Sequence, residues 1–435
     1  MNNQLPSNII KYLNKFSSDK WKTYHSHFRK YKTIIVIPAI SEYENLGLLL
    51  DSLSKNDDRY FRETLILFVI NNLESTSEKI KLNNLKTIEL LKQVRDTYSD
   101  TSKLSIDFID ASTEKNELDA KNGGVGLARK IGMDLALTLF DYDSKNQNLL
   151  VCLDGDCTVE PNYITTIRNY FNENNLYAGY VNFKHMDVTD AENERAIINY
   201  EIFLRYYVLG LIYAKSPYAY HSIGSTMVCD SDSYIKVQGM NKRKAAEDFY
   251  FMEKLSKITK IKKIGNTAVL PSSRGSWRVP FGTGQRVNRF MDKVQDEYIL
   301  YSPKSFEMLR KWIECFHSEE ILTTENYLAH ANEISKTLAN FLSQNKFAEN
   351  WTQILRNSKS DSQIIKQKSL WFDGFRTLKL VHYLRDTEFP PINMFNALDE
   401  LFGMLDVSFN FQNEFGNIPP IDVQKKYLDK LREIA

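Results

Sequence analysis

The sequence predicts an α/β fold, with a mostly parallel sheet flanked by helices and a helical region at the C-terminal end. Over the first two thirds of the chain, short apolar runs rich in β-branched residues alternate with amphipathic stretches of helical length. That alternation is typical of right-handed βαβ units, which build parallel sheets. From about Val287 onward the segments have helical periodicity only, and we expect no further strand there.

The elements can be placed approximately from their patterns. The core strands are expected at residues 33–37, 65–70, 104–109 and 149–153, with later strands at 177–184 and 268–270. Helices are expected at 77–98, 123–140, 162–172 and 192–215. Another helix follows the first strand, where Ser41 and Glu44 have the spacing of a capping box. We therefore divide the chain into an N-terminal arm (1–32), an α/β domain (33–290) and a helical region (291–435).

Composition narrows the class of protein. The 435 residues carry a net charge of +1, so no overall field attracts nucleic acid or an anionic membrane. The four cysteines lack CxxC spacing, which argues against a zinc site or a disulfide framework. Neither a signal peptide nor an apolar run of about 18 residues is present, so we expect a cytoplasmic protein without a transmembrane segment. Peripheral association with the inner face of a membrane stays open.

The acidic pair Asp154 and Asp156 directly follows the apolar run at 149–153, with Gly155 between them. Carboxylates at the carboxyl end of a buried strand stand where open α/β sheets bind ligands, and two of them suit a hard divalent cation. Asp-Gly is also an ordinary turn signal, so a solvated turn is the alternative.

Three other stretches combine charges or glycines. Glu247 and Asp248 open a helix, where carboxylates commonly complement the helix dipole. Arg274, Arg278 and Arg286 lie in a glycine-bearing loop that suits an anionic ligand such as a diphosphate. The GGVG stretch at 123–126 starts a helix, and its glycines indicate either close approach of a ligand or tight packing on the sheet.

Five stretches together resemble the GT-A glycosyltransferases, in particular the family 2-like group that uses nucleotide-diphospho-sugars. They are IPAISEYENL (37–46), FVINN (68–72), GGVGLARKIGMDLAL (123–137), LLVCLDGDC (149–157) and AEDFYFMEKL (246–255). They occur in the family's order and cover roughly residues 33–290. The resemblance implies a GT-A, Rossmann-like domain and does not extend to the first thirty residues or the C-terminal third.

The resemblance also implies roles for individual residues. The nucleotide pocket would be lined by Pro38, Ala39, Glu42, Asn72 and Arg129, with Asp154 near the ribose or sugar. A divalent cation, Mn²⁺ or Mg²⁺, would be held by Asp154 and Asp156, and Asp156 is the principal ligand. Asp248 would be the catalytic base, with Glu247 orienting donor or acceptor, while Arg274 and Arg278 would share the binding of the diphosphate. No histidine stands between His221 and His317, so the histidine metal ligand of many such enzymes has no counterpart there.

The expected function is therefore metal-dependent transfer of a sugar, hexosyltransferase-like and inverting, for synthesis of a glycan or cell-surface polysaccharide. The partners would be a nucleotide-sugar donor and a glycan, lipid-linked or small-molecule acceptor, without nucleic acid. One alternative is a nucleotidyltransferase that makes the activated sugar, although the glycine-rich phosphate loop of those enzymes is missing after the first strand. The other is a non-catalytic GT-A-like module that binds a partner.

Overall fold

The computed structural model describes residues 5–25, 29–101, 104–144, 146–275, 282–294, 296–409 and 417–435. The chain forms two compact units, and neither is continuous in sequence. The first comprises Met1–Val188 and Ser222–Gln285, and the second comprises Thr189–His221 and Arg286–Ala435. The N-terminal arm thus belongs to the first unit, and the helix expected at 192–215 belongs to the second. The domain limits drawn from the sequence stay a prediction.

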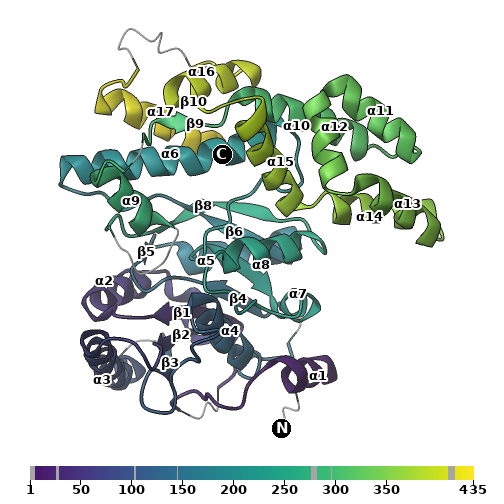
Figure 1. The fold of residues 1–435 in the computed structure, drawn as a ribbon. Helices are drawn as coiled ribbons and strands as arrows, with labels where there is room; N and C mark the ends of the chain where they lie inside the picture. Colours follow the sequence, from purple (N-terminus) through teal and green to yellow (C-terminus); the bar gives the residue numbers. More distant parts are fainter. Residues whose placement is uncertain are drawn as a thin grey trace. The chain divides into compact units, whose positions relative to one another are not determined.

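The first unit contains an eight-stranded sheet in the order β3-β2-β1-β4-β7-β6-β8-β5 (Figure 1). Its strands are β1 (Thr33–Ala39), β2 (Thr64–Asn71), β3 (Ser105–Ala111), β4 (Leu149–Cys152), β5 (Thr158–Val159), β6 (Ala178–Phe183), β7 (Met227–Asp230) and β8 (Lys262–Leu270). Strands β3, β2, β1 and β4 are parallel, and so are β6 and β8. Strand β7 is antiparallel to both neighbours, and β5 is antiparallel to β8. The predicted mostly parallel α/β sheet is confirmed.

Helices cover both faces of this sheet. Successive side chains of a strand point to opposite faces, and in β1 the side chains of Ile35 and Ile37 share a buried cluster with the apolar side of α2 (Tyr43–Ser54). Residues of α3 (Glu78–Thr101) and α5 (Tyr163–Asn174) complete that cluster. On the opposite face lies α4 (Val125–Ala136), where a Cβ on Gly132 would clash with Val36 and Val69. The absence of a side chain at Gly132 therefore allows α4 to pack tightly on the sheet.

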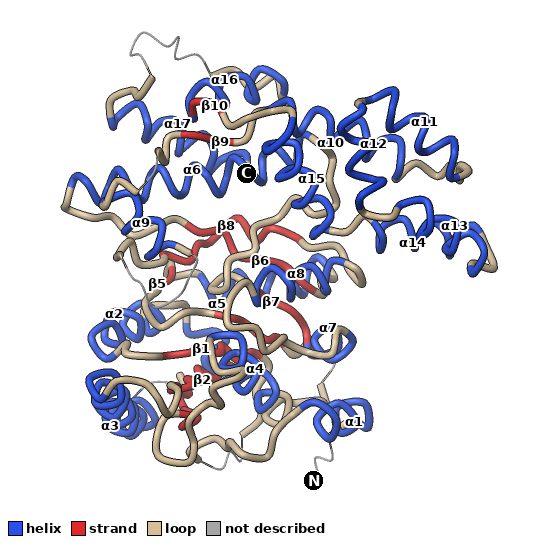
Figure 2. Tube along the Cα trace, in the orientation of Figure 1, coloured by secondary structure: helices blue, strands red, loops and turns tan. Residues whose placement is uncertain are grey.

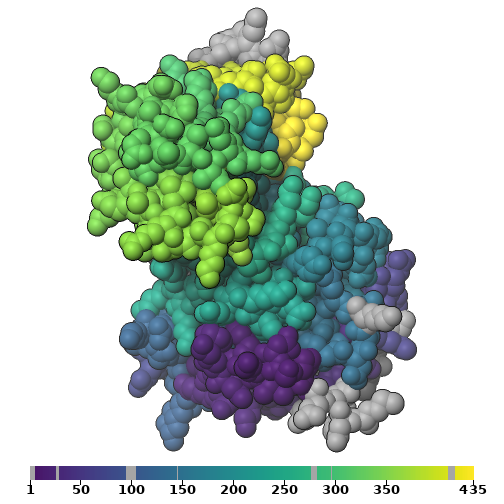
Figure 3. Space-filling model, turned by 90° about the vertical axis from the view of Figure 1, so that its right-hand side faces the viewer, coloured from purple at the N-terminus to yellow at the C-terminus, as the bar shows by residue number. Residues whose placement is uncertain are grey.

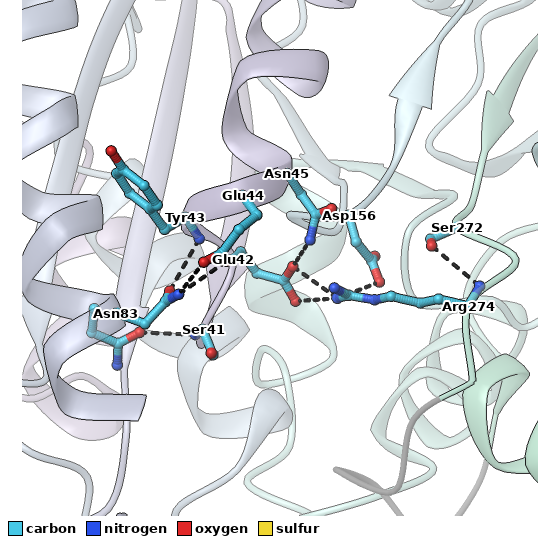
Figure 4. A network of polar contacts seen from close by, with 10 residues as sticks. Ser41, Glu42, Tyr43, Glu44, Asn45, Asn83, Asp156, Ser272 and Arg274 are labelled. Atoms are coloured by element: carbon cyan, nitrogen blue, oxygen red, sulfur yellow. Dashed lines mark hydrogen bonds and ion pairs between the residues drawn. The ribbon is translucent and has the colours of Figure 1, made fainter. Parts of the chain in front are cut away.

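The start of α2 differs from the prediction. The capping box is wrong, because Ser41 adopts a left-handed conformation with φ of 55° and the helix begins at Tyr43 without a side-chain cap. Two asparagines of α3 replace it (Figure 4). Asn84 Oδ1 accepts from the Ser41 amide at 2.9 Å, and Asn83 Oδ1 accepts from the Tyr43 amide at 3.1 Å. Asn83 also donates to Glu44 Oε2 at 2.9 Å, so Glu44 contacts the neighbouring helix.

The N-terminal arm packs against the first unit through α1 (Ser7–Phe16). Ile9 and Tyr12 are buried, and the Tyr12 hydroxyl donates to Asp134 of α4 at 2.8 Å. Trp21 donates its indole N–H to the Asn116 carbonyl at 2.7 Å. In Figure 3 the part of the chain coloured dark purple, toward its N-terminal end, forms one continuous part of the surface. Further helical segments of this unit are η1 (Asp58–Glu63), α7 (Ser231–Lys236) and α8 (Glu247–Ser256).

The second unit is almost wholly helical, as predicted (Figure 2). Its helices are α6 (Ala191–Tyr213), α10 (Pro303–Phe316), α11 (Thr324–Ile334), α12 (Lys336–Gln344), α13 (Phe347–Asn357), α14 (Asp361–Trp371), α15 (Gly374–Thr387), α16 (Met394–Met404) and α17 (Ile421–Ile434), while α9 (Thr283–Met291) spans the division between the units. The expectation of no further strand is wrong in detail, because β9 (Ile299–Leu300) and β10 (Ile392–Asn393) pair antiparallel. Trp312, Phe316 and Trp351 lie in its aromatic core. Among the described residues, every helix falls short of the length and apolar character needed to cross a membrane.

Candidate active site

Five acidic side chains and two arginines of the first unit are connected where several strands end. Glu42 follows β1, Asp154 and Asp156 follow β4, and Arg274 follows β8. Arg129 lies in α4, and Glu247 and Asp248 form the first turn of α8. Because Thr33 of β1 is opposite both Thr64 of β2 and Leu149 of β4, the carboxyl ends of these parallel strands meet at one edge. That edge is where open α/β sheets bind ligands.

Arg129 connects the two predicted acidic motifs. Its Nη2 lies 2.5 Å from Asp154 Oδ1, and its Nη1 pairs with Glu247 Oε1. Only 2% of Arg129 is exposed. Burial opposes its positive charge, but the Asp154 and Glu247 carboxylates outweigh that effect and raise the pKa of Arg129. Arg129 is thus a permanent buried cation that fixes the strand end of β4 to the start of α8.

Gly224 makes room for this arginine, and the sequence analysis missed it. A Cβ at position 224 would overlap the Arg129 guanidinium. The residue stands in a stretch of small side chains that looked like an ordinary loop, so no motif distinguished it. A glycine is needed here because backbone approaches a buried charged group closely.

Arg274 makes the second connection (Figure 4). Its Nη2 lies 2.8 Å from both carboxylate oxygens of Glu42 and 3.0 Å from Asp156 Oδ2. Asn45 donates to Glu42 Oε2 at 2.6 Å and so fixes that carboxylate from the α2 side. Burial opposes the charge of Arg274, but Asp156 and then Glu42 outweigh it and raise the pKa of the guanidinium. Glu42 and Asp156, which are far apart in sequence, therefore share one nitrogen atom.

The acidic pair also forms a turn. The Cys157 amide donates to the Asp154 carbonyl at 3.2 Å, which closes the chain around Gly155. A Cβ on Gly155 would lie 3.0 Å from Glu42 Cγ, so any larger residue would press on the Glu42 side chain. The turn signal in the sequence was therefore correct, and this turn directs its two carboxylates to two different arginines.

Asp248 has the protonation behaviour expected of a base that works near neutral pH. Its Oδ1 accepts from the Phe249 amide at 2.7 Å, and the side chain is half-buried. Burial, and next the neighbouring Glu247 carboxylate, raise the pKa of Asp248 to about 7, while Arg129 acts in the opposite direction. A general base is most efficient when its pKa lies close to the working pH.

The other predicted nucleotide-binding residues lie in or near the same edge, and their roles stay predictions. Pro38 and Ala39 are buried at the end of β1. Asn72 is 2% exposed, and its amide donates to the Leu73 and Ser112 carbonyls at 3.1 Å each. Arg278 lies outside the described residues.

A divalent cation at the acidic pair would need further ligands from a bound molecule or from water. Within the described ranges, no three or more His, Cys, Asp or Glu side chains are grouped so that they could hold a metal by themselves. Mg²⁺ at nucleotide sites is usually held by one or two carboxylates together with substrate phosphates and water. Asp154 and Asp156 provide such a pair, in a cluster where acidic side chains outnumber arginines.

Comparisons with known proteins give structural neighbours only. No protein-family description and no curated protein matches the chain. The chain is similar to S. aureus TarS 1-349, with 13% identity and a TM-score of 0.37; the match covers 78% of this chain and 91% of that 1–349 chain. TarS 1-349 in complex with UDP-GlcNAc has 12% sequence identity and a TM-score of 0.37, and the match covers 92% of this chain and 89% of that chain. The mannosyltransferase PcManGT from Pyrobaculum calidifontis in complex with GDP-Man and Mn²⁺ also has 12% identity and a TM-score of 0.37. That match covers 87% of this chain and 92% of the PcManGT chain. The function of this chain has to be argued from its own residues.

Proposed function

We propose that this chain is a metal-dependent, inverting glycosyltransferase that moves a sugar from a nucleotide-diphosphate donor to an acceptor hydroxyl, for glycan or cell-surface polysaccharide synthesis. One observation carries the proposal. A carboxyl group with a pKa of about 7, Asp248, is linked through Glu247 and Arg129 to a second acidic pair suited to a metal–diphosphate complex. The ordered motifs that resemble GT-A glycosyltransferases support the same function.

On the acceptor side, Asp248 accepts the proton of the attacking hydroxyl. The acceptor oxygen then forms a bond to the anomeric carbon on the face opposite the leaving group. The bond from that carbon to the diphosphate oxygen breaks, and the nucleoside diphosphate leaves with the electron pair. Because attack and departure occur on opposite faces, the base and the diphosphate site must be separate. Asp248 lies in α8, whereas Asp156 follows β4 and contacts Arg274.

On the donor side, Arg274 and the acidic pair receive the diphosphate. When bound, the cation would supply Lewis-acid stabilisation of the charge that builds up on the leaving phosphate oxygens. Asp156 and Asp154 would hold it. Arg274 exchanges part of its contact with Glu42 and Asp156 for phosphate oxygens, which its planar guanidinium can bind bidentately. Arg129 keeps its two carboxylate partners and acts as a positioning residue.

Calorimetry with UDP and GDP, each with and without Mn²⁺, tests the donor side. We expect one nucleotide to bind with an affinity that depends on Mn²⁺, and Asp156→Ala to abolish that dependence. Asp19→Ala, which removes an exposed carboxylate of the N-terminal arm, is the matched control and should bind as wild type does. Unchanged nucleotide affinity in Asp156→Ala would reject the assignment.

Hydrolysis of, or transfer from, a panel of nucleotide-sugars tests the chemistry. Asp248→Asn should bind nucleotide normally and lose transfer, because the amide cannot take the proton. Substantial transfer by this variant would exclude Asp248 as the base. If wild type neither hydrolyses nor transfers any donor and instead retains a protein partner, the binding-module alternative would replace the enzyme.

A further inference from the structure

Directly before the proposed base stands a basic loop formed by Lys242, Arg243 and Lys244, all of them exposed. Among the residues that the structure describes, none of the three forms an ion pair with a carboxylate. The Arg243 guanidinium is stacked 3.8 Å from the centroid of the Tyr250 ring, and Lys244 donates to the Ala120 carbonyl at 2.9 Å. The two arginines of the candidate site, in contrast, are both held by carboxylates. Within the described part of the chain, the basic loop thus presents positive charge that is not paired with a carboxylate.

The backbone of the basic loop is held firmly in place. Asn241 Oδ1 accepts from the Arg243 amide at 3.1 Å, and Asn241 Nδ2 donates to the Glu247 carbonyl at 2.9 Å. On its other side the loop packs on the glycine-led start of α4. A Cβ on Gly126 would overlap the Arg243 carbonyl, and a Cβ on Gly124 would lie 3.0 Å from Lys244 Cα. These two glycines of the GGVG stretch therefore accommodate the basic loop, and a ligand is not needed to explain them.

The basic loop is close to the position of attack. Lys244 is four residues before Asp248, and four residues span at most about 14 Å even when fully extended. An acceptor whose hydroxyl reaches Asp248 would have its neighbouring groups within reach of the loop. The carboxylates Glu247 and Asp248 repel a negative group, whereas the basic loop attracts it. This distribution of charge would turn the hydroxyl toward the base and an anionic group away from it.

We propose that the acceptor is an anionic molecule, carrying a phosphate or carboxylate near the attacking hydroxyl, and that the basic loop holds this anionic group. The proposal rests on the proposed function, since it names the acceptor class for the same site. Arg243 supplies a planar donor that Tyr250 orients by stacking, and Lys242 and Lys244, its neighbours in sequence, add two positive charges.

The test compares wild type with the triple variant K242Q/R243Q/K244Q. Binding is measured to three oligomers: oligogalacturonate for carboxylates, short-chain polyphosphate for phosphates, and maltohexaose as a neutral reference. UDP or GDP with Mn²⁺ is present so that the donor side is filled. We expect wild type to bind one anionic oligomer more tightly than maltohexaose, and this binding to weaken at higher salt. The triple variant should bind that oligomer with about tenfold lower affinity. Which oligomer is preferred shows whether the basic loop binds a phosphate or a carboxylate group of the acceptor.

The matched control K11Q/K22Q/K260Q removes the same charge from exposed lysines elsewhere in the first unit and should bind the oligomer as wild type does. Nucleotide affinity and the thermal unfolding midpoint of both variants show whether the fold is intact. Binding of the anionic oligomer by the triple variant as tightly as by wild type, or binding of maltohexaose as tightly as the anionic oligomers, would overturn the proposal. Failure of wild type to bind any nucleotide would instead count against the proposed function, whatever the oligomers show.

Discussion

Replacing Asp248 with asparagine should stabilise the folded protein at alkaline pH. The pKa of Asp248 is raised to about 7, from about 3.8 in an unfolded chain, so folding disfavours its charged form. For a carboxyl shifted upward, stability falls as pH rises from the unfolded pKa to the folded pKa, because only the native state keeps the proton in that window. A shift of about three units corresponds to an upper limit of about 4 kcal/mol. The side chain retains some solvent contact, so we expect about 1–2 kcal/mol.

Urea unfolding at pH 5 and pH 8 measures this effect. Asp248→Asn should be more stable than wild type at pH 8, and the difference should shrink at pH 5, where the wild-type carboxyl is protonated in the folded state. Sugar transfer by wild type should rise about tenfold from pH 6 to pH 8, since a base with a pKa near 7 is mostly protonated at pH 6. A variant that is equally stable or less stable than wild type at pH 8 would refute the assumption that burial raises this pKa.

Three further substitutions test the packing and charges of the first unit. Arg129→Met should lower the free energy of unfolding by about 3 kcal/mol in urea titrations, since it leaves a buried carboxylate without its cation; a loss below 1 kcal/mol would contradict this. Gly132→Ala should cost about 1–3 kcal/mol because its Cβ would clash with Val36, while the control Gly47→Ala meets no atom within 4 Å and should be neutral or stabilising. Arg274→Ala should strengthen binding of Mn²⁺ alone, followed by electron paramagnetic resonance, and weaken binding of nucleotide with Mn²⁺; effects of the same sign would reject a shared role.

The sheet was predictable because its central strands are buried on both faces. Strands β1 and β2 are buried along their whole length, and such strands appear in sequence as short continuous apolar runs. The four-residue strand β7 was missed, since Met227–Asp230 follows a stretch of small residues and its partners β4 and β6 are remote in sequence. The predicted capping box of α2 was wrong for a similar reason. Asn83 and Asn84 come from another helix, and a local pattern cannot reveal them.

The candidate site was predictable in its acidic residues but not in its pairing. Carboxylates that follow a buried strand or begin a helix can be located in the sequence, because the strand and the helix can themselves be predicted from their patterns. The partners of Arg129 and Arg274 depend on how strands and helices are brought together, and Arg274 contacts a glutamate 232 positions away. The motif resemblance assigned Arg129 to the nucleotide, whereas its burial between Asp154 and Glu247 favours a positioning role.

The balance of charges explains why a cation and a nucleotide should bind together. In the proposed function, a strongly anionic nucleoside diphosphate would approach a cluster in which four carboxylates contact two arginines. Without a cation the carboxylates would repel it. Of the two arginines, Arg274 is the one positioned to exchange a carboxylate for a phosphate, since the Arg129 guanidinium is buried between two partners. A divalent cation held by Asp154 and Asp156 would offset most of the negative charge that faces the phosphates. The cation would also compete with Arg274 for Asp156, so the Arg274 guanidinium would become available to the diphosphate.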